Sequence, residues 1–395
     1  MKIVLITVFI IFAPYLTVTN ANTVTDTINI FNTPLQINIE PSFKFQFTTK
    51  PSGNTVEAFY DRISATNYQP LIETIQDYKA EQQLNDWLFY QTVRAVAERI
   101  SPKKENYLRY TLFKWFLLNK SGYDARLASR DEQIIMYVRT NDDISDLPFF
   151  NLGNDIFICL NHHDYNELFK INEPYSLINF EIPEAKNAFS YKITNMPTLK
   201  ADKYEEKKVA FNYKGKTYKF NLQINQDINT LFKNYPIVDF ETYFNIPMSE
   251  RTYQSLIPQL VEKVKNLSIE KGVDYLMRFT RKAFLYEDDW ITFGKEKRFS
   301  PEATLSAEAS DCDDRVALFF YLVKEIYNLP MITLRYPTHV TMAIQFDKPI
   351  GQSIFYEGQY FTVCEPTPQA ENLNIGQLSK QHKDQLYEVV YHYVP

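Results

Sequence analysis

The sequence has few glycines and cysteines, no basic stripe, and no long apolar run beyond its first residues. Its 9 glycines form no glycine-rich phosphate loop, which argues against the common nucleotide-binding motifs. Three cysteines are too few, and odd in number, for a disulfide framework. A net charge of −6 without a compensating basic cluster argues against nucleic acid as a partner. Past the N-terminus, no segment approaches the ~20 apolar residues that a membrane span needs.

What the chain does contain is typical of a folded globular protein. Its 395 residues suffice for two ordinary domains, and 45% of them are hydrophobic against 23% charged. There are 30 Phe and 28 Tyr, so we expect an interior rich in aromatic rings.

The first residues resemble a secretory signal peptide. Lys2 is followed by the short apolar run 3–12, and Thr19 and Ala21 place small residues at the −3 and −1 positions of a cleavage site. We therefore predict export, with residues 1–21 removed and the mature protein in the periplasm or outside the cell. The alternative, an uncleaved anchor, is disfavoured because the apolar run is short.

The two halves of the chain share a pattern that suggests an internal duplication. Residues 106–138 align without a gap with residues 312–344, and each segment predicts a helix followed by β-structure. In this alignment Cys159 matches Cys364. The charged stretch 200–208 lacks apolar periodicity, so we divide the chain into modules 22–200 and 201–395.

The second half carries a cysteine, a histidine and a glutamate that its counterpart lacks. Cys312 aligns with Asn106, His339 with Gln133, and Glu365 with Leu160. We therefore predict that the first module keeps the fold but lacks the catalytic residues. The second module also has about 18 extra residues before Cys312, including 293–297 and Pro301–Glu302, which we interpret as a wall or lid of a cleft.

Spacing along the chain predicts that these three residues meet. Ser310 or Asp311 would cap a helix from Cys312 to about Tyr327, and the segment 331–346 would return antiparallel to it. A further strand, 360–365, would then set Glu365 opposite His339, with facing residue numbers that sum to about 704. A thiol, an imidazole and a carboxylate so placed are typical of a cysteine nucleophile with its base and orienting acid.

The groups around the thiol are expected to shift its pKa in opposite directions. A helix N-terminus and a neighbouring imidazolium favour the thiolate, whereas the aspartates at 311, 313 and 314 raise the pKa of a thiol. Arg315 could offset one aspartate, or the aspartates could cap the helix or pair elsewhere. Sequence leaves these alternatives open.

These segments resemble the transglutaminase-like cysteine-protease superfamily, in particular its secreted bacterial members. The resemblance is carried by Asp311-Cys312-Asp313-Asp314-Arg315, by Tyr336-Pro337-Thr338-His339-Val340 and by Glu365-Pro366-Thr367, and it covers about 285–367. It implies an α+β, papain-like core in which a helix packs on an antiparallel sheet, with catalytic Cys312, His339 and a carboxylate. The superfamily usually has Asp where this chain has Glu365.

The resemblance implies acyl transfer through a thioester on a peptide or protein substrate, with no metal or organic cofactor. We expect hydrolysis rather than cross-linking, because hydrolysis needs no second substrate site. The alternative is a non-catalytic secreted binding or scaffold protein with a decayed fold of this kind. The oligomeric state is not predicted.

Other candidate residues have simpler interpretations. His162-His163-Asp164 could suggest a metal site, but a polar loop after a strand explains them better. Cys159 and Cys364 are expected to be core residues. Trp290 could line the cleft or simply pack.

Overall fold

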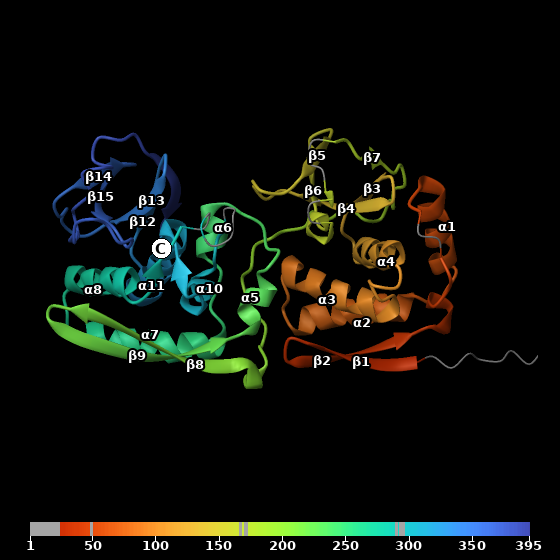
Figure 1. The fold of residues 1–395 in the computed structure, drawn as a ribbon, viewed down its shortest axis with the longest axis horizontal. Helices are drawn as coiled ribbons and strands as arrows, with labels where there is room; N and C mark the ends of the chain where they lie inside the picture. The colour runs from red at the N-terminus through yellow and green to blue at the C-terminus, as the bar shows by residue number, and fades with distance from the viewer. Residues whose placement is uncertain (1–23, 48–49, 166–167, 170–172, 289–290, 292–296) are drawn as a thin grey trace, which may run out of the picture.

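The computed structural model shows a mixed α+β protein with antiparallel sheets, arranged as two lobes side by side (Figure 1). It describes residues 24–47, 50–165, 168–169, 173–288, 291 and 297–395. The signal peptide predicted at residues 1–21, the loop segment 293–296 and Trp290 lie outside the described residues.

The first lobe begins with a β-hairpin, continues through four helices and ends in a sheet. Its elements are β1 (Val24–Ile30), β2 (Thr33–Ile39), η1 (Pro41–Phe43), α1 (Gly53–Ser64), α2 (Gln69–Glu81), α3 (Asp86–Ile100), α4 (Tyr107–Lys120), β3 (Ala125–Arg130), β4 (Gln133–Thr140), β5 (Phe149–Leu152), β6 (Asp155–Cys159), η2 (His162–Asp164) and β7 (Ser176–Leu177).

The second lobe follows the same plan with additional short elements. It contains η4 (Ala201–Lys203), β8 (Tyr204–Tyr213), β9 (Lys216–Asn225), α5 (Asp227–Leu231), α6 (Phe240–Phe244), α7 (Glu250–Val264), α8 (Ile269–Lys282), β10 (Leu285–Tyr286), α10 (Pro301–Ser306), β11 (Ala309–Ser310), α11 (Cys312–Tyr327), β12 (Met331–Tyr336), β13 (His339–Ile344), β14 (Ser353–Tyr356), β15 (Gln359–Cys364) and β16 (Glu388–Tyr393).

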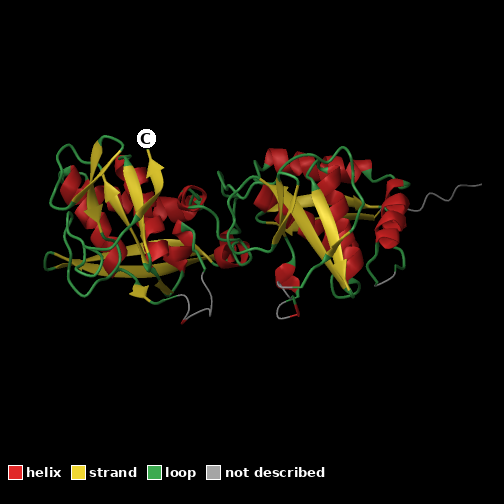
Figure 2. Ribbon diagram, turned by 90° about the horizontal axis from the view of Figure 1, so that it is seen from above, coloured by secondary structure: helices red, strands yellow, loops and turns green. Residues whose placement is uncertain are grey.

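The two five-stranded sheets have the same topology. One has the strand order β5-β6-β4-β3-β7 and the other β14-β15-β13-β12-β16, and every pair of neighbouring strands is antiparallel. In both lobes the sheet lies on one side of the helices and the two-stranded hairpin on the other, as Figure 1 shows from the side and Figure 2 from above.

The central helix of the second lobe, α11, is held by its sequence at both ends. The Asp311 side chain accepts a hydrogen bond from the Asp314 amide, as an N-cap residue does. Asn328 ends the helix in the left-handed conformation, with φ of 49°. All residues from Val316 to Val323 are buried, so this helix is covered on every side. These predicted boundaries are confirmed.

The β-structure after α11 differs from the expectation. Segment 331–346 does not return as one strand but forms a hairpin, in which Tyr336 pairs with His339 across a turn at Pro337 and Thr338. β12 thus runs back toward the start of α11, and His339 is the first residue of the next strand. The turn makes His339 the residue closest to the hairpin tip, since only two residues separate the strands.

The charged stretch 200–208 is also more ordered than expected. Its residues from Tyr204 onward form the first half of β8, which pairs along its whole length with β9. Lys214 and Gly215 form the turn between the two strands, and both residues have positive φ. Glu205, Glu206 and Lys208 are exposed and no residue of 204–208 is buried, so a search for apolar periodicity does not detect this half of the strand.

Part of the second lobe's chain packs against the first lobe. The Trp87 indole donates to the Leu231 carbonyl at 3.2 Å, and the Tyr235 hydroxyl donates to the Tyr191 carbonyl at 2.6 Å. The segment between β9 and α6 therefore joins the lobes through buried aromatic contacts. Within the described residues, no helix combines the length and hydrophobicity needed to cross a membrane.

Candidate active site

Three elements of the second lobe meet at the predicted residues. Cys312 begins α11, His339 begins β13, and Glu365 directly follows β15. Cys312 lies close enough to Val340, the neighbour of His339, for the Val340 backbone to lower the pKa of the thiol. The structure therefore brings the three sequence-predicted residues into one neighbourhood.

His339 and Glu365 form a direct contact. The Nε2 atom of His339 lies 2.8 Å from Oε2 of Glu365, and both side chains are almost fully buried. The second carboxylate oxygen, Oε1, accepts from the Thr367 amide at 2.8 Å. Because Nε2 faces the carboxylate, a neutral ring carries its proton there and leaves Nδ1 as the proton acceptor.

The strand register at this contact differs from the predicted register by two residues. Met342 pairs with Cys364, so facing residue numbers sum to 706, and a direct partner of Glu365 would be Thr341. His339 lies two residues before Thr341 in β13, so it meets Glu365 diagonally. Diagonal neighbours on one face of a sheet lie ~7–8 Å apart at their Cα atoms, within reach of long side chains.

The Cys312 thiol is partly exposed and lies in an anionic environment. Its Sγ donates to Oδ1 of Asp313 at 3.4 Å. Burial raises the pKa of Cys312 well above its ordinary value, and the charges of Asp313 and Asp311 raise it further, while the Val340 amide lowers it. Between the opposing effects that the sequence left open, burial and the aspartates prevail.

The three aspartates have separate structural roles. Asp311 caps α11, and Asp313 forms an ion pair with Arg298 in which Nε lies 3.3 Å from Oδ2. Asp314 is fully buried and accepts from the Tyr243 hydroxyl and the Phe299 amide, at 2.8 and 2.7 Å. α6 and the chain that follows residues 293–297 are thereby tied to the start of α11.

Arg315 does not neutralise an aspartate, as the sequence had suggested it could. Its fully buried guanidinium donates to five backbone carbonyls, those of Ser310, Thr280, Arg281, Phe284 and Leu285. Burial lowers the pKa of Arg315 to about 10. This side chain fastens the C-terminal end of α8 to the helix that carries Cys312.

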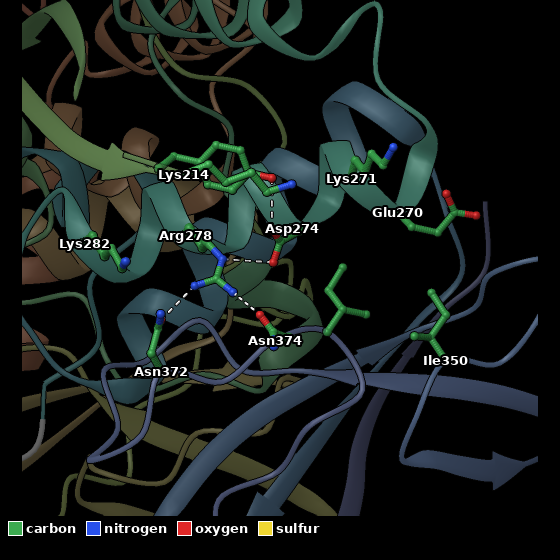
Figure 3. Close-up of a pocket in the computed structure, with 11 residues that line it drawn as sticks. Lys214, Glu270, Lys271, Asp274, Arg278, Lys282, Ile350, Asn372 and Asn374 are labelled. Carbon is green, nitrogen blue, oxygen red and sulfur yellow. Dashed lines mark hydrogen bonds and ion pairs between the residues drawn. The ribbon is translucent and has the colours of Figure 1, made fainter. Parts of the chain in front are cut away.

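Two further arginines of α8 hold the chain that follows Glu365. Arg281 donates to the carbonyl of Glu365 through Nε, at 3.1 Å, and through a second guanidinium nitrogen, and it also donates to Leu373. Arg278 bonds to Asp274, Asn372 and Asn374, which Figure 3 shows on the floor of a pocket of about 480 Å³. The backbone of Glu365 is thus anchored independently of its carboxylate.

His382 is a site residue that the sequence analysis missed. Its ring stacks on that of His339, with centroids 4.6 Å apart and planes at 10°, and is tilted by 41° against the Tyr336 ring at 5.3 Å. His382 is buried and belongs to no motif, so only its type, one of five histidines, could have drawn attention to it. The stack restricts the orientation of the His339 ring.

A hollow of about 710 Å³ lies beside the start of α11. Its lining includes Leu285 and Tyr286 of β10, Phe299, and Ala309 of β11, which precedes Cys312 by three residues. Burial raises the pKa of Tyr286 to about 12, and the nearby Cys312 and Asp311 contribute to this shift. Tyr286 is therefore a wall of the site. Pro301 and Glu302, expected in a lid, are instead buried in α10.

At the same positions of the first lobe, different residues occur. Gln133 begins β4 as His339 begins β13, which agrees with the alignment. The pairing of Tyr137 with Cys159, however, places Cys159 level with Val363 rather than Cys364, and Asn161 rather than Leu160 level with Glu365. The alignment of β6 was wrong by one residue, because identical cysteines outweighed the inward and outward alternation of the strand.

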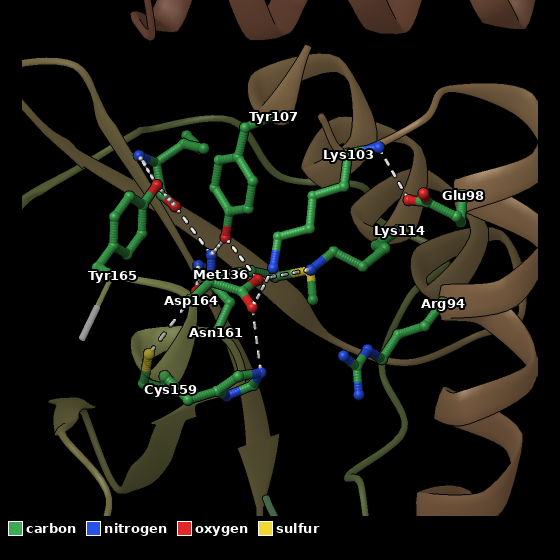
Figure 4. A network of polar contacts seen from close by, with 12 residues as sticks. Arg94, Glu98, Lys103, Tyr107, Lys114, Met136, Cys159, Asn161, Asp164 and Tyr165 are labelled. Atoms are coloured by element: carbon green, nitrogen blue, oxygen red, sulfur yellow. Dashed lines mark hydrogen bonds and ion pairs between the residues drawn. The ribbon is translucent and has the colours of Figure 1, made fainter. Parts of the chain in front are cut away.

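The first lobe has a polar contact at this place, with Gln133 and Asn161 at the positions of His339 and Glu365. The Asn161 amide donates to the hydroxyl of Tyr107, the first residue of α4, at 2.8 Å. Asp164 accepts from Tyr107 and from Lys103, and Figure 4 shows these groups as one network. Beneath it, burial lowers the pKa of Lys114 to about 7, although the charge of Asp164 opposes this shift.

The His162-His163-Asp164 segment serves this network. It forms the short helix η2, in which His163 lies 3.3 Å from Asp164 and burial lowers the pKa of His163 to about 3. Among the described residues, no group of three or more His, Cys, Asp or Glu side chains could hold a metal ion. Cys159 and Cys364 are buried and unbridged, and Cys312 is likewise a free thiol.

Comparisons of the chain with protein-family models, with curated proteins and with solved structures found no match.

Proposed function

We propose that this protein is an exported, transglutaminase-like cysteine enzyme that transfers acyl groups of peptides or amides through a thioester. The observation that carries the proposal is the 2.8 Å contact between His339 and Glu365, near Cys312, whose thiol pKa is lowered by the backbone of Val340. A buried carboxylate that orients an imidazole next to a cysteine at a helix start is the arrangement that nucleophilic catalysis requires.

In the proposed reaction, Nδ1 of His339 takes the thiol proton as Sγ attacks the substrate carbonyl. The carbon–sulfur bond forms, the carbon–nitrogen bond breaks, and His339 returns the proton to the departing amine. Water then attacks the thioester, with His339 again as base, and releases the acid and the free thiol. Glu365 holds the ring and stabilises the imidazolium that forms in each step.

The raised pKa of Cys312 favours proton transfer during attack over a resting thiolate–imidazolium pair. We propose hydrolysis as the main outcome, since an amine acceptor would need a second binding site. Transfer to an amine, which cross-links proteins, is the alternative within the same chemistry.

We further propose that the two lobes are degenerate and active copies of one transglutaminase-like, papain-like module. The identical order of the strands in the two sheets supports a duplication. The first copy has Asn106, Gln133 and Asn161 where the second has Cys312, His339 and Glu365.

A non-catalytic binding or scaffold role is the competing function. It is favoured by a specific observation: the thiol donates to Asp313, while its pKa is raised. In that case Cys312 would react no faster than an ordinary partly buried thiol.

Hydroxylamine trapping distinguishes the two functions even while the natural substrate is unidentified. A thioester on Cys312 reacts with hydroxylamine to give a hydroxamate, so a mixed peptide pool should yield hydroxamates with the wild type and none with Cys312→Ala. Cys159→Ala, which removes a buried thiol of the other lobe, is the matched control and should leave the yield unchanged. A primary-amine probe in place of hydroxylamine would reveal cross-linking.

Alkylation provides an independent measurement. With His339 as base, the iodoacetamide reaction of Cys312 at about pH 8 should slow several-fold in His339→Ala. The control is His392→Gln, which alters a partly exposed histidine on β16. Equal rates in wild type and His339→Ala, together with no hydroxamate, would establish the non-catalytic function.

A further inference from the structure

A pocket of about 640 Å³ lies between the two lobes and is lined by both of them. The first lobe contributes Arg94 of α3, Lys103 and Asp164, and the second contributes Lys233 and Arg298. Its volume lies in the ~300–1,000 Å³ range of ligand sites, which occur preferentially between domains.

The lining of this interlobe pocket is strongly cationic. Five lysine and arginine side chains face two carboxylates, in a chain whose net charge is −6. Two of the five cations are paired, Lys103 with Asp164 at 2.5 Å and Arg298 with Asp313 at 3.3 Å, and Asp146 accepts from the Ile237 amide at 2.8 Å. Positive charge remains in excess even when Asp313 is counted. Because positive charge in a concave site concentrates anions, the pocket is built to attract a negative group.

Several of these cations are partly withdrawn from water. The Arg298 side chain is 15% exposed, and Arg94 is half-buried with one guanidinium nitrogen donating to Gln91 at 2.9 Å. Partial desolvation strengthens the attraction for an anion, since the effective dielectric constant falls. An arginine can also bind a carboxylate or phosphate through two parallel hydrogen bonds.

The pocket is linked to the candidate nucleophile through two contacts. Arg298, on the pocket wall, forms the ion pair with Asp313, and Asp313 accepts from the thiol of Cys312. One side chain therefore separates the pocket wall from the reactive sulfur. An anionic group in the pocket and an acyl group at Cys312 could belong to one peptide.

We propose that the interlobe pocket binds an acidic group, a carboxylate or a phosphate, of the peptide substrate whose acyl group Cys312 attacks. This inference rests on the proposed function and names its substrate class. The degenerate lobe then supplies half of the substrate site, through Arg94 and Lys103, although it has no chemistry of its own.

Binding to Cys312→Ser tests the proposal separately from catalysis. Three labelled peptides would be compared by fluorescence anisotropy: one rich in Glu, its Gln counterpart, and one with phosphoserine. We expect the Glu peptide to bind at least about tenfold more tightly than the Gln peptide at about 50 mM salt, and the preference to shrink as salt rises. Tighter binding of the phosphoserine peptide would assign the site to phosphate.

Two substitutions connect this preference to the pocket. Lys233→Gln changes an exposed side chain and Arg94→Gln a half-buried one, so the first variant keeps the test valid if the second does not fold. Each should weaken binding of the acidic peptide several-fold, while Lys380→Gln, an exposed lysine paired with Glu371, should not. Equal binding of the Glu and Gln peptides, or no effect of either variant, would overturn the proposal. Selective binding of the acidic peptide without hydroxamate formation would support the proposed binding site and contradict only the catalytic function.

Discussion

His339 and Glu365 meet along a diagonal of the β13–β15 pair, with Nε2 and Oε2 2.8 Å apart. The residue directly opposite Glu365 in the register is Thr341, whose hydroxyl instead donates to the Cys364 carbonyl at 3.2 Å. A diagonal contact favours a long side chain at position 365, and the glutamate side chain reaches the imidazole.

Shortening this side chain should therefore impair the site. We expect Glu365→Asp to reduce hydroxamate formation roughly 10–100-fold, because the carboxylate no longer reaches Nε2. Glu365→Gln keeps the length of the side chain but cannot stabilise an imidazolium. We expect it to reduce hydroxamate formation about 100-fold or more. Full activity of Glu365→Asp would show that the diagonal contact is not required.

The charge of Asp313 should control the reactivity of the thiol. Asp313→Asn should lower the pKa of Cys312, because an adjacent anion that raises it is removed. Arg298→Gln should have the opposite effect, since Asp313 loses its ion-pair partner. The pH dependence of the alkylation rate measures both shifts, and Asp347→Asn, an exposed carboxylate on the loop after β13, serves as control.

Lys114 should make the first lobe less stable at neutral pH than at alkaline pH. Its pKa is lowered to about 7 in the folded protein from 10.5, so between these values the unfolded chain binds the additional proton. Stability should consequently rise as the pH increases through this window and be flat above it.

Lys114→Met should remove this dependence and stabilise the lobe at about pH 7 by roughly 1–3 kcal/mol. Asp164 would keep its partners Lys103 and Tyr107, so no carboxylate is left alone. Denaturant unfolding at two pH values measures the effect, with the exposed Lys104→Met as control. A less stable Lys114→Met at neutral pH would show that the ion pair with Asp164 outweighs the burial cost.

The carbonyl contacts of Arg315 should be essential for the position of Cys312. Arg315→Lys places a compact ammonium where the planar guanidinium now donates to five carbonyls. We expect this change to destabilise the second lobe by roughly 2–4 kcal/mol. Thermal unfolding measures this loss. Arg335→Lys, at an exposed ion pair, should change the midpoint little, and an equal effect of both variants would contradict the assigned role.

Local signals in the sequence were sufficient for the elements that carry the site. Asp311, Asn328 and the apolar run between them determine α11, because capping and burial act over neighbouring residues. The mixture of helices and antiparallel strands follows from the same short-range rules. The hairpin at Pro337 was missed since a two-residue turn within an apolar stretch changes periodicity very little.

Only the tertiary structure decided how these residues are connected to the rest of the molecule. These connections join residues that are far apart in the chain. They include the two-residue shift in register, the stacking of His382 on His339, the separate partners of Asp313 and Arg315, and the cationic pocket between the lobes. Such contacts depend on how whole elements pack, and a side chain carries no local sign of the partner that packing will bring to it.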